Sequence, residues 1–133
     1  MLVTSVEAVT RGFRWNGLNG YSVTGTYTYD DTIDGRMIRE KGKGKTNRLQ
    51  SLKVSFYNSS GKLLYDREDI IDGESLGKYF EFNLDTATQQ LFGSIDVGGE
   101  NYGELFLKGR IDDGLSLIKI DSSGKEYLLD SDK

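Results

Sequence analysis

The acidic residues of segment 30–35 are the first candidates for chemistry, because hard cations bind several oxygen ligands on a flexible loop. Asp30, Asp31 and Asp34 crowd before Gly35 in the sequence DDTIDG. Their spacing differs from that of an EF-hand loop, and no glutamate stands where a bidentate ligand is needed. We expect a solvated acidic turn here, with a calcium site as the alternative.

Carboxylate pairs could serve general acid–base catalysis, and Glu81, Asp96 and Glu104 lie on neighbouring predicted strands. Carboxylates on adjacent strands can stand roughly 5 to 10 Å apart, the separation that glycosidases use. Alternation of polar and apolar residues places all three on outward faces, where burial would not raise a pKa. We therefore expect solubilising surface charge rather than a catalytic pair.

Segment 36–48 is basic, in contrast to the rest of the chain. Six basic residues against the single acid Glu40 give it a charge of +5, so a net charge of −4 leaves −9 elsewhere. Four of its cations recur at every second position: Arg39, Lys41, Lys43 and Lys45. On a strand they would form a row on one face, and such a row could bind phosphates or an anionic polysaccharide. A solvated hairpin is the simpler expectation.

No apolar residue lies between Ile38 and Leu49, so nothing is expected to anchor this interval to a core. Gly42 and Gly44 offer no side chain to pack and cost more entropy to order. Lysines on an edge strand also discourage further pairing. The segment is therefore predicted to be the most mobile or the most edge-like part of the molecule.

Cysteine and histidine are both absent from the 133 residues. Disulfides, thiolate nucleophiles, histidine bases and metal sites built from these residues are therefore excluded. We expect no cofactor, and we predict that the chain is not an enzyme. The net negative charge disfavours a nucleic-acid partner.

The aromatic residues are numerous enough to furnish a core, with eight tyrosines, six phenylalanines and one tryptophan. Six of them could instead line a cavity for a small ligand: Trp15, Tyr27, Tyr29, Phe56, Phe80 and Phe82. A small β-barrel can either be filled by its side chains or hold one small ligand, so both interpretations fit the same fold. A packed core is the simpler of the two.

Strands are the elements expected to position these residues, and segment 78–120 is the clearest case. Apolar residues alternate with polar ones in runs at 80–84, 90–97 and 104–111, and a fourth run follows at 115–120. Short turn signals separate the runs, of which Asp112-Asp113-Gly114 is a strong hairpin signal. Sequential strands joined by short turns form an antiparallel meander.

Further strands are predicted at 1–9, 21–29, 49–57, 62–66 and 125–129, with at most one short helical turn, in 69–77. Two turns are alike, Asn58–Lys62 and Asp121–Lys125, by convergence on hairpin chemistry or by internal duplication. We expect one all-β domain over 1–133, an antiparallel up-and-down meander closing into a barrel or strongly curled sheet of lipocalin or avidin size. A β-sandwich is the alternative.

Two stretches, YSVTGTYTYDDT and FNLDTATQQLFGSIDVGG, resemble pieces of exported bacterial, especially cyanobacterial, all-β domains that carry a Pro-Glu-Pro sorting tail. The resemblance covers about a quarter of the chain and implies a non-enzymatic all-β domain. It supplies no catalytic or binding residue. The sequence has neither a signal peptide nor such a tail, so as written it predicts a cytoplasmic protein, exported only if Met1 begins a trimmed chain.

Three functions remain open at this point. The leading hypothesis is a structural or interaction domain with a filled interior, whose partner is unknown and which could form a homo-oligomer through a strand edge. The alternative is a small-ligand-binding barrel with an open apolar interior. The third is a carboxylate enzyme, which would need two close acids in a concave site and a raised pKa. No run of apolar residues is long enough to predict a membrane span.

Overall fold

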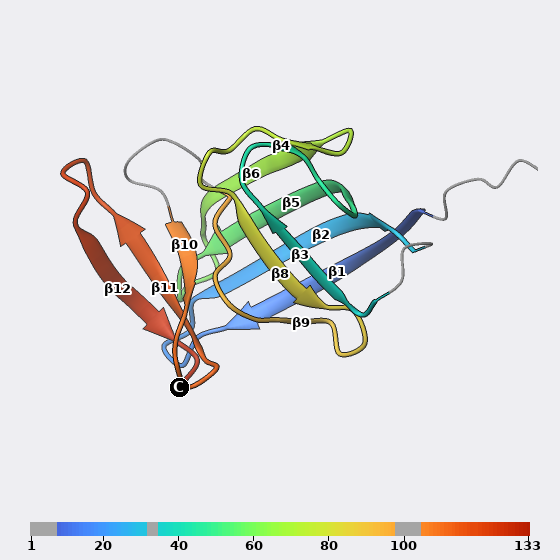
Figure 1. Cartoon of the computed structure of the whole chain (residues 1–133). Coiled ribbons are helices and arrows are strands. Elements are labelled where there is room, and N and C mark those ends of the chain that lie inside the picture. Colours follow the sequence, from blue (N-terminus) through green and yellow to red (C-terminus); the bar gives the residue numbers. More distant parts are fainter. Residues whose placement is uncertain (1–7, 32–34, 98–104) are drawn as a thin grey trace, which may run out of the picture.

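The computed structural model describes residues 8–31, 35–97 and 105–133 (Figure 1). These ranges contain twelve strands and no helix, and every strand pair is antiparallel, which confirms the all-β expectation. The first sheet has six strands, in the order β1 (Ala8–Asn16), β2 (Ser22–Asp30), β5 (Leu49–Tyr57), β6 (Leu63–Ile71), β7 (Glu74–Ser75) and β4 (Gly44–Lys45).

Two three-stranded sheets complete the fold. The second sheet has the order β3 (Met37–Lys41), β8 (Glu81–Asp85) and β9 (Gln90–Leu91). The third has the order β10 (Leu105–Gly109), β11 (Leu115–Ile120) and β12 (Glu126–Ser131). Single bridges connect the second sheet to the third, because Asp96 pairs with Glu81 and Ile95 pairs with Leu107.

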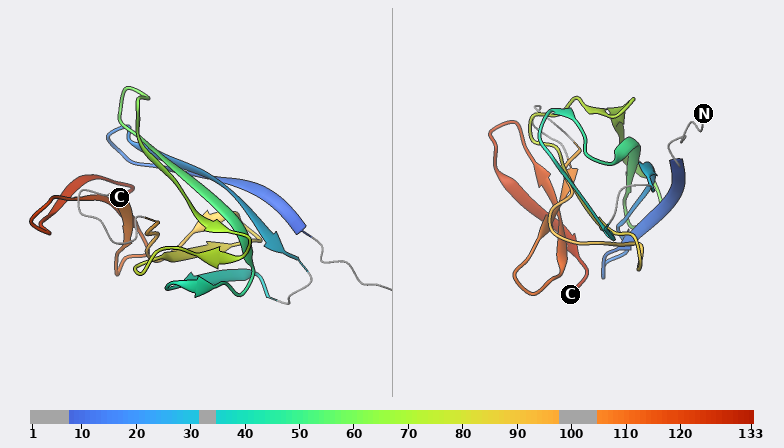
Figure 2. Two further views of the ribbon diagram at one scale, coloured as in Figure 1. Left: turned by 90° about the horizontal axis from the view of Figure 1, so that it is seen from above. Right: turned by 45° about the vertical axis from the view of Figure 1, so that its right-hand side comes forward.

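The sheets form two facing layers with a projecting third sheet. Figure 1 shows β3 and β8 crossing in front of the long strands β1, β2 and β5, and Figure 2 shows the two layers from above. In the described ranges no sheet closes on itself, because β1 pairs only with β2 and β12 only with β11. The expected barrel is therefore not confirmed.

The core lies between the two layers and is built around three aromatic rings. Phe13 of β1, Tyr27 of β2 and Phe82 of β8 have centroids 5.7 to 6.3 Å apart. All three are buried, and Tyr27 and Phe82 have no exposed surface. Aromatic contacts of this kind add to the stability that area burial provides, so the rings hold the first sheet to the second.

A glycine makes room for one of these rings. Gly25 lies directly opposite Phe13 in the pairing of β1 with β2. A Cβ at Gly25 would lie 2.3 Å from the Phe13 ring and 2.7 Å from the Lys53 carbonyl oxygen. The missing side chain is thus the space that the ring fills, and the sheet keeps a dense core at this point.

Several predicted strands have the expected bounds, since β5 covers 49–57 and β11 covers 115–120. Others differ. Residues 1–7 lie outside the described ranges, and the first described strand is 8–16. The helical turn expected in 69–77 is wrong, because β6 continues to Ile71 and turns into β7 through Asp72 and Gly73. Both residues have positive φ, at 50° and 77°, which closes a tight hairpin rather than a helix.

The strands of the basic segment 36–48, β3 and β4, lie at the ends of their sheets, as do β1, β9, β10 and β12. That this segment is the most edge-like part of the molecule stays a prediction. The expectation that nothing anchors it is wrong. The Glu40 side chain is only 3% exposed, and its carboxylate accepts hydrogen bonds from the backbone N–H groups of residues 47, 48 and 49 at 2.7 to 2.8 Å. The buried Glu40 carboxylate therefore anchors the segment by hydrogen bonds, a role that an apolar side chain usually has.

Candidate functional site

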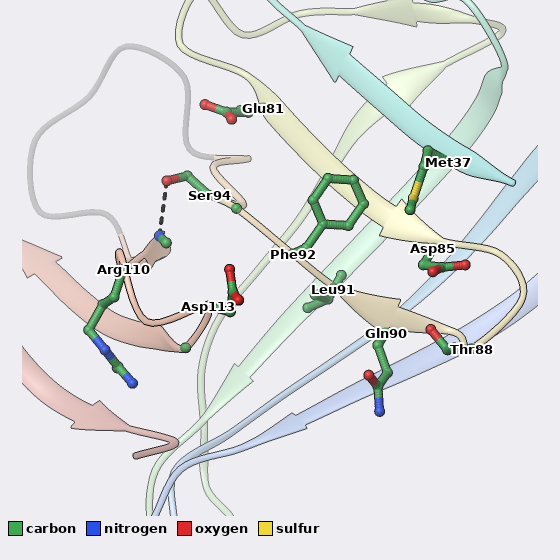
Figure 3. A pocket seen from close by; sticks show the side chains of 13 residues that line it. Met37, Glu81, Asp85, Thr88, Gln90, Leu91, Phe92, Ser94, Arg110 and Asp113 are labelled. Atoms are coloured by element: carbon green, nitrogen blue, oxygen red, sulfur yellow. Dashed lines mark hydrogen bonds between the residues drawn. The ribbon is translucent and has the colours of Figure 1, made fainter.

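An open cleft of about 590 Å³ lies between the second sheet and the β10–β11 hairpin (Figure 3). One wall comes from β8, β9 and the segment that follows β9. The other comes from Gly109 to Gly114, at the end of β10 and in the turn to β11. Figure 3 shows Arg110 and Asp113 on one side of Phe92 and Leu91, and Met37, Asp85, Thr88 and Gln90 on the other.

Close backbone contact fixes the two walls relative to each other. A Cβ on Gly109 would lie 2.8 Å from the Cα of Gly93, so both positions are glycine where the chains meet. The Gly109 N–H donates to the Ser94 hydroxyl at 3.1 Å. The Asn83 side-chain amide donates to the Ser94 carbonyl oxygen at 3.0 Å. The segment 92–94 is thus bonded to β8 on one side and to β10 on the other.

Apolar and aromatic surface lines part of the cleft. Met37 of β3, Leu91 of β9 and Phe92 contribute it, and all three are at least partly exposed. The Arg39 guanidinium carbon lies 5.3 Å from the centroid of the Phe92 ring, a cation–π contact that holds the ring in place. The cleft therefore contains an ordered aromatic surface next to polar groups.

Two of the charged groups in the cleft are already neutralised. Arg36 forms an ion pair with Asp85. The hydrogen bond that its guanidinium donates is the main cause that lowers the pKa of Asp85. Arg110 donates to Asp112 at 3.1 Å and to Asp132 at 3.2 Å. These pairs serve the architecture of the cleft rather than its ligand.

Other polar groups remain available. Glu81 lines the cleft and accepts a hydrogen bond from the Asn83 amide at 3.0 Å. Among the described residues, no hydrogen bond or ion pair involves the side chains of Asp113 or Gln90, both of which line the cleft. The Ser94 hydroxyl accepts from Gly109 and keeps its own proton to donate.

A smaller recess of about 320 Å³ continues the cleft toward the end of β1. The two adjoin, because they share Gln90, Leu91 and Asp113, and we refer to them together as the groove. Its far end is formed by Trp15 and Asp132, whose carboxylate accepts from the indole Nε1 at 3.1 Å.

The six aromatic residues predicted to line a cavity are all buried, each at most 6% exposed. They pack in the core: Trp15, Tyr27, Tyr29, Phe56, Phe80 and Phe82. Of these, Trp15 also borders the smaller recess. Burial raises the pKa of Tyr27 to about 12, and its hydroxyl bonds to the Gln89 side chain. These residues are therefore placed to hold the layers together.

Of the predicted calcium ligands, Asp34 lies outside the described residues, and Asp30 and Asp31 end β2 and begin the loop after it. Among the residues that the structure describes, no three acidic side chains come close enough to hold a metal ion. The calcium site stays a prediction, because one of its three ligands is not described.

Of the three candidate catalytic acids, Glu81 and Asp96 face each other across a bridge, and Glu104 lies outside the described ranges.

The four cations of the predicted row are exposed: Arg39, Lys41, Lys43 and Lys45. The strand register partly compensates them. Glu81 lies opposite Lys41, and Glu74 lies opposite Lys45. Two cations of the row thus have an acid across the strand, which weakens the field that an anionic polymer would meet.

The residues of the cleft were not predicted as a site from the sequence. Asp113 is recognisable only as part of a turn signal, and Gln90 and Phe92 only as alternating residues of a strand. Their meeting depends on the contact between Gly93 and Gly109, which no local pattern indicates. A glycine in each of two predicted strands was the one available signal, because such glycines mark close backbone approach.

No protein-family model, curated protein or solved structure matches this chain. The resemblance to exported all-β domains stays a prediction. Within the described ranges no helix is long and apolar enough to cross a membrane.

Proposed function

We propose that this chain is a non-enzymatic interaction domain that binds a polar ligand in the groove between the second sheet and the β10–β11 hairpin. The observation that carries the proposal is the contrast between a filled interior and an open polar cleft of about 590 Å³. Ligand sites are concave, with apolar surface and a few polar groups that fix orientation. The groove has both.

The filled core argues against the alternative of a small-ligand-binding barrel. Such a barrel needs an open interior, whereas Tyr27, Phe56, Phe80 and Phe82 are each at most 1% exposed. The rings of Tyr27 and Phe82 contact each other, and the ring of Phe56 contacts that of Tyr65, as in a packed core. A ligand would have to displace them, and removing a large core side chain costs about 3 to 5 kcal/mol.

Asp85 and Asp112 are held ionised by hydrogen bonds, unlike a catalytic acid. A catalytic acid at neutral pH needs a pKa raised toward 7. In and beside the cleft, hydrogen bonds lower the pKa of two carboxyl groups instead. A hydrogen bond from Arg36 lowers the pKa of Asp85, and one from the Gly114 N–H lowers that of Asp112. Both carboxylates are therefore held ionised, as groups that position the walls.

The test is a screen of polar fragments against the ¹⁵N-labelled protein by amide correlation spectra. We expect the shifted amides to cluster in 90–94 and 109–114. The variant Gln90→Leu should weaken the response, whereas Thr26→Ala, on the outer face of the first sheet, should leave it unchanged. Shifts clustered elsewhere, for example around Leu64 and Leu129 in the recess between β6 and β12, would refute the assignment.

A further inference from the structure

We infer that the ligand of this groove is a neutral oligosaccharide, either a free chain or a segment of a polysaccharide. The inference rests on the proposed function and names the chemical class that the groove would take. It follows from three properties of the described residues: the kind of polar groups, the balance of charge, and the size of the groove.

The available polar groups match hydroxyls. Gln90 offers an amide that both donates and accepts, Glu81 and Asp113 offer carboxylate oxygens that accept, and the Ser94 hydroxyl can donate. Neighbouring hydroxyls of a sugar both donate and accept, so planar amide and carboxylate groups can bond two of them at once. The apolar C–H face of a sugar ring would pack on Phe92, whose ring Arg39 holds at 5.3 Å.

The charge around the groove has both signs, which favours a neutral ligand over an ionic one. Asp85 is paired with Arg36, and Arg110 is paired with Asp112 and Asp132. The remaining acids are Glu81, which lies opposite Lys41 across the strands, and Asp113. A site for a charged ligand concentrates charge of one sign, and this groove does not.

The cleft and the recess together offer more space than a single sugar requires. The cleft of about 590 Å³ and the recess of about 320 Å³ share three residues and run from Met37 on β3 to Trp15 on β1. Sites for drug-sized ligands have volumes of about 300 to 1,000 Å³. The combined space is therefore suited to several linked sugar units.

Native gel electrophoresis through soluble polysaccharides tests this inference. The gels contain xyloglucan, galactomannan, mixed-linkage β-glucan, soluble starch or dextran as neutral probes, and polygalacturonate or heparin as anionic probes. We expect at least one neutral polysaccharide to retard the protein. Titration of oligosaccharides from that polysaccharide should give an affinity that about 0.5 M sodium chloride leaves unchanged, because no ion pair is formed.

Substitutions assign the binding to the groove. Phe92→Ala and Gln90→Ala should each weaken the affinity about three- to tenfold, the effect of losing one packed ring or hydrogen bond. Thr26→Ala is the matched surface control and should bind as the parent chain does. Thermal melts of all three confirm that they are folded.

The outcomes separate the inference from the proposed function. No retardation by any neutral polysaccharide overturns the inference, and the proposed function survives if polar fragments still shift the amides of 90–94 and 109–114. Retardation by an anionic gel alone, abolished when Lys41, Lys43 and Lys45 are replaced by serine, also overturns it and assigns binding to the basic row. Retardation by a neutral gel that Phe92→Ala and Gln90→Ala both leave intact places the sugar elsewhere and overturns the inference, and the fragment screen then decides the proposed function.

Discussion

Two buried carboxylates, Glu40 and Asp130, hold backbone segments together, within the basic segment and between the two ends of the chain respectively. Glu40 accepts from the N–H groups of residues 47–49. Asp130, which is 2% exposed, accepts from the N–H groups of Asn19, Tyr21 and Ser131 at 2.8 to 3.1 Å. Buried donors that lack a partner are costly, so each carboxylate stabilises the fold by satisfying several at once.

Replacing Asp130 by alanine should therefore cost about 2 to 4 kcal/mol of unfolding free energy, because donors of Asn19 and Tyr21 lose their acceptor. Urea unfolding at neutral pH measures the loss. Asp113→Asn is the matched control, since that side chain has no hydrogen bond among the described residues, and it should cost under about 0.5 kcal/mol. Equal losses for the two variants would mean that Asp130 is not the anchor.

Phe82 lies at the centre of the core. Phe82 is 0% exposed and contacts Phe13 and Tyr27, so Phe82→Ala should cost about 3 to 5 kcal/mol by leaving a cavity between the layers. The neighbouring Glu81 lies on the other face of β8, where it accepts one hydrogen bond from Asn83, and Glu81→Ala should cost about 0.5 to 1.5 kcal/mol. Chemical denaturation of both variants decides, and comparable losses would place the wrong face of β8 in the core.

At the scale of elements, the two similar turns have the same hydrogen bonds. Asn58 Oδ1 accepts from the N–H and hydroxyl of Ser60 and from the Lys62 N–H. Asp121 Oδ1 accepts from the equivalent groups of Ser123 and Lys125. A side-chain oxygen and a later glycine meet the needs of the same turn in both hairpins. Convergence and internal duplication both predict this shared geometry.

We predict that the stability of the fold depends on pH through Asp121, and that the substitution Asp121→Asn removes this dependence. The Ser123 hydroxyl, followed by the Lys125 N–H and the Tyr127 hydroxyl, lowers the pKa of Asp121 to about 2. A depressed pKa contributes stability above the unfolded value of about 3.9, and this contribution is lost as the pH falls through about 2. Asp121→Asn should fold, since Asn58 makes the same turn, and should lack this dependence.

Thermal melts between about pH 5 and pH 2 measure the difference in stability between the parent chain and Asp121→Asn, and that difference should shrink as the pH falls. Asn58→Asp is the reciprocal control and should gain a weaker dependence of the same sign, because Leu64 stands where Tyr127 stands in the other turn. The effect is small because Asp121 is exposed to solvent. A difference that stays constant across this range would show that the hydrogen bonds do not favour the ionised form.

The sequence predicts those elements whose information is local. Alternation and flanking turns were sufficient for β5 and β11, whose bounds agree with the structure. The run 90–97 was predicted as one strand, but Gly93, with φ of 62°, interrupts it beside Gly109. The anchors Glu40 and Asp130 were not predicted, because charged residues in alternating strands look like surface positions until their distant partners are known.

At the scale of the whole molecule, the position of the third sheet sets the width of the groove. The end of β12 is bonded to the β1–β2 turn through Asp130 and through the Leu18 N–H, which donates to the Ser131 carbonyl oxygen at 2.8 Å. Asp132 accepts from Trp15, Arg110 and the Leu115 N–H. The C-terminal strand thus ties the β10–β11 hairpin to the first sheet. The candidate site was beyond sequence analysis because it exists only where three sheets meet.

The absence of cysteine allows a direct test of the central claim, that this groove is the binding site. A single cysteine introduced by Gln90→Cys can be labelled with a bulky maleimide, which should fill the groove without unfolding the chain, because residue 90 is exposed. Binding of the fragments that shift the amides of 90–94 in the unlabelled variant should then be lost, whereas the same label on Thr26→Cys should leave it unchanged. Binding that persists with the label at residue 90 would contradict the account.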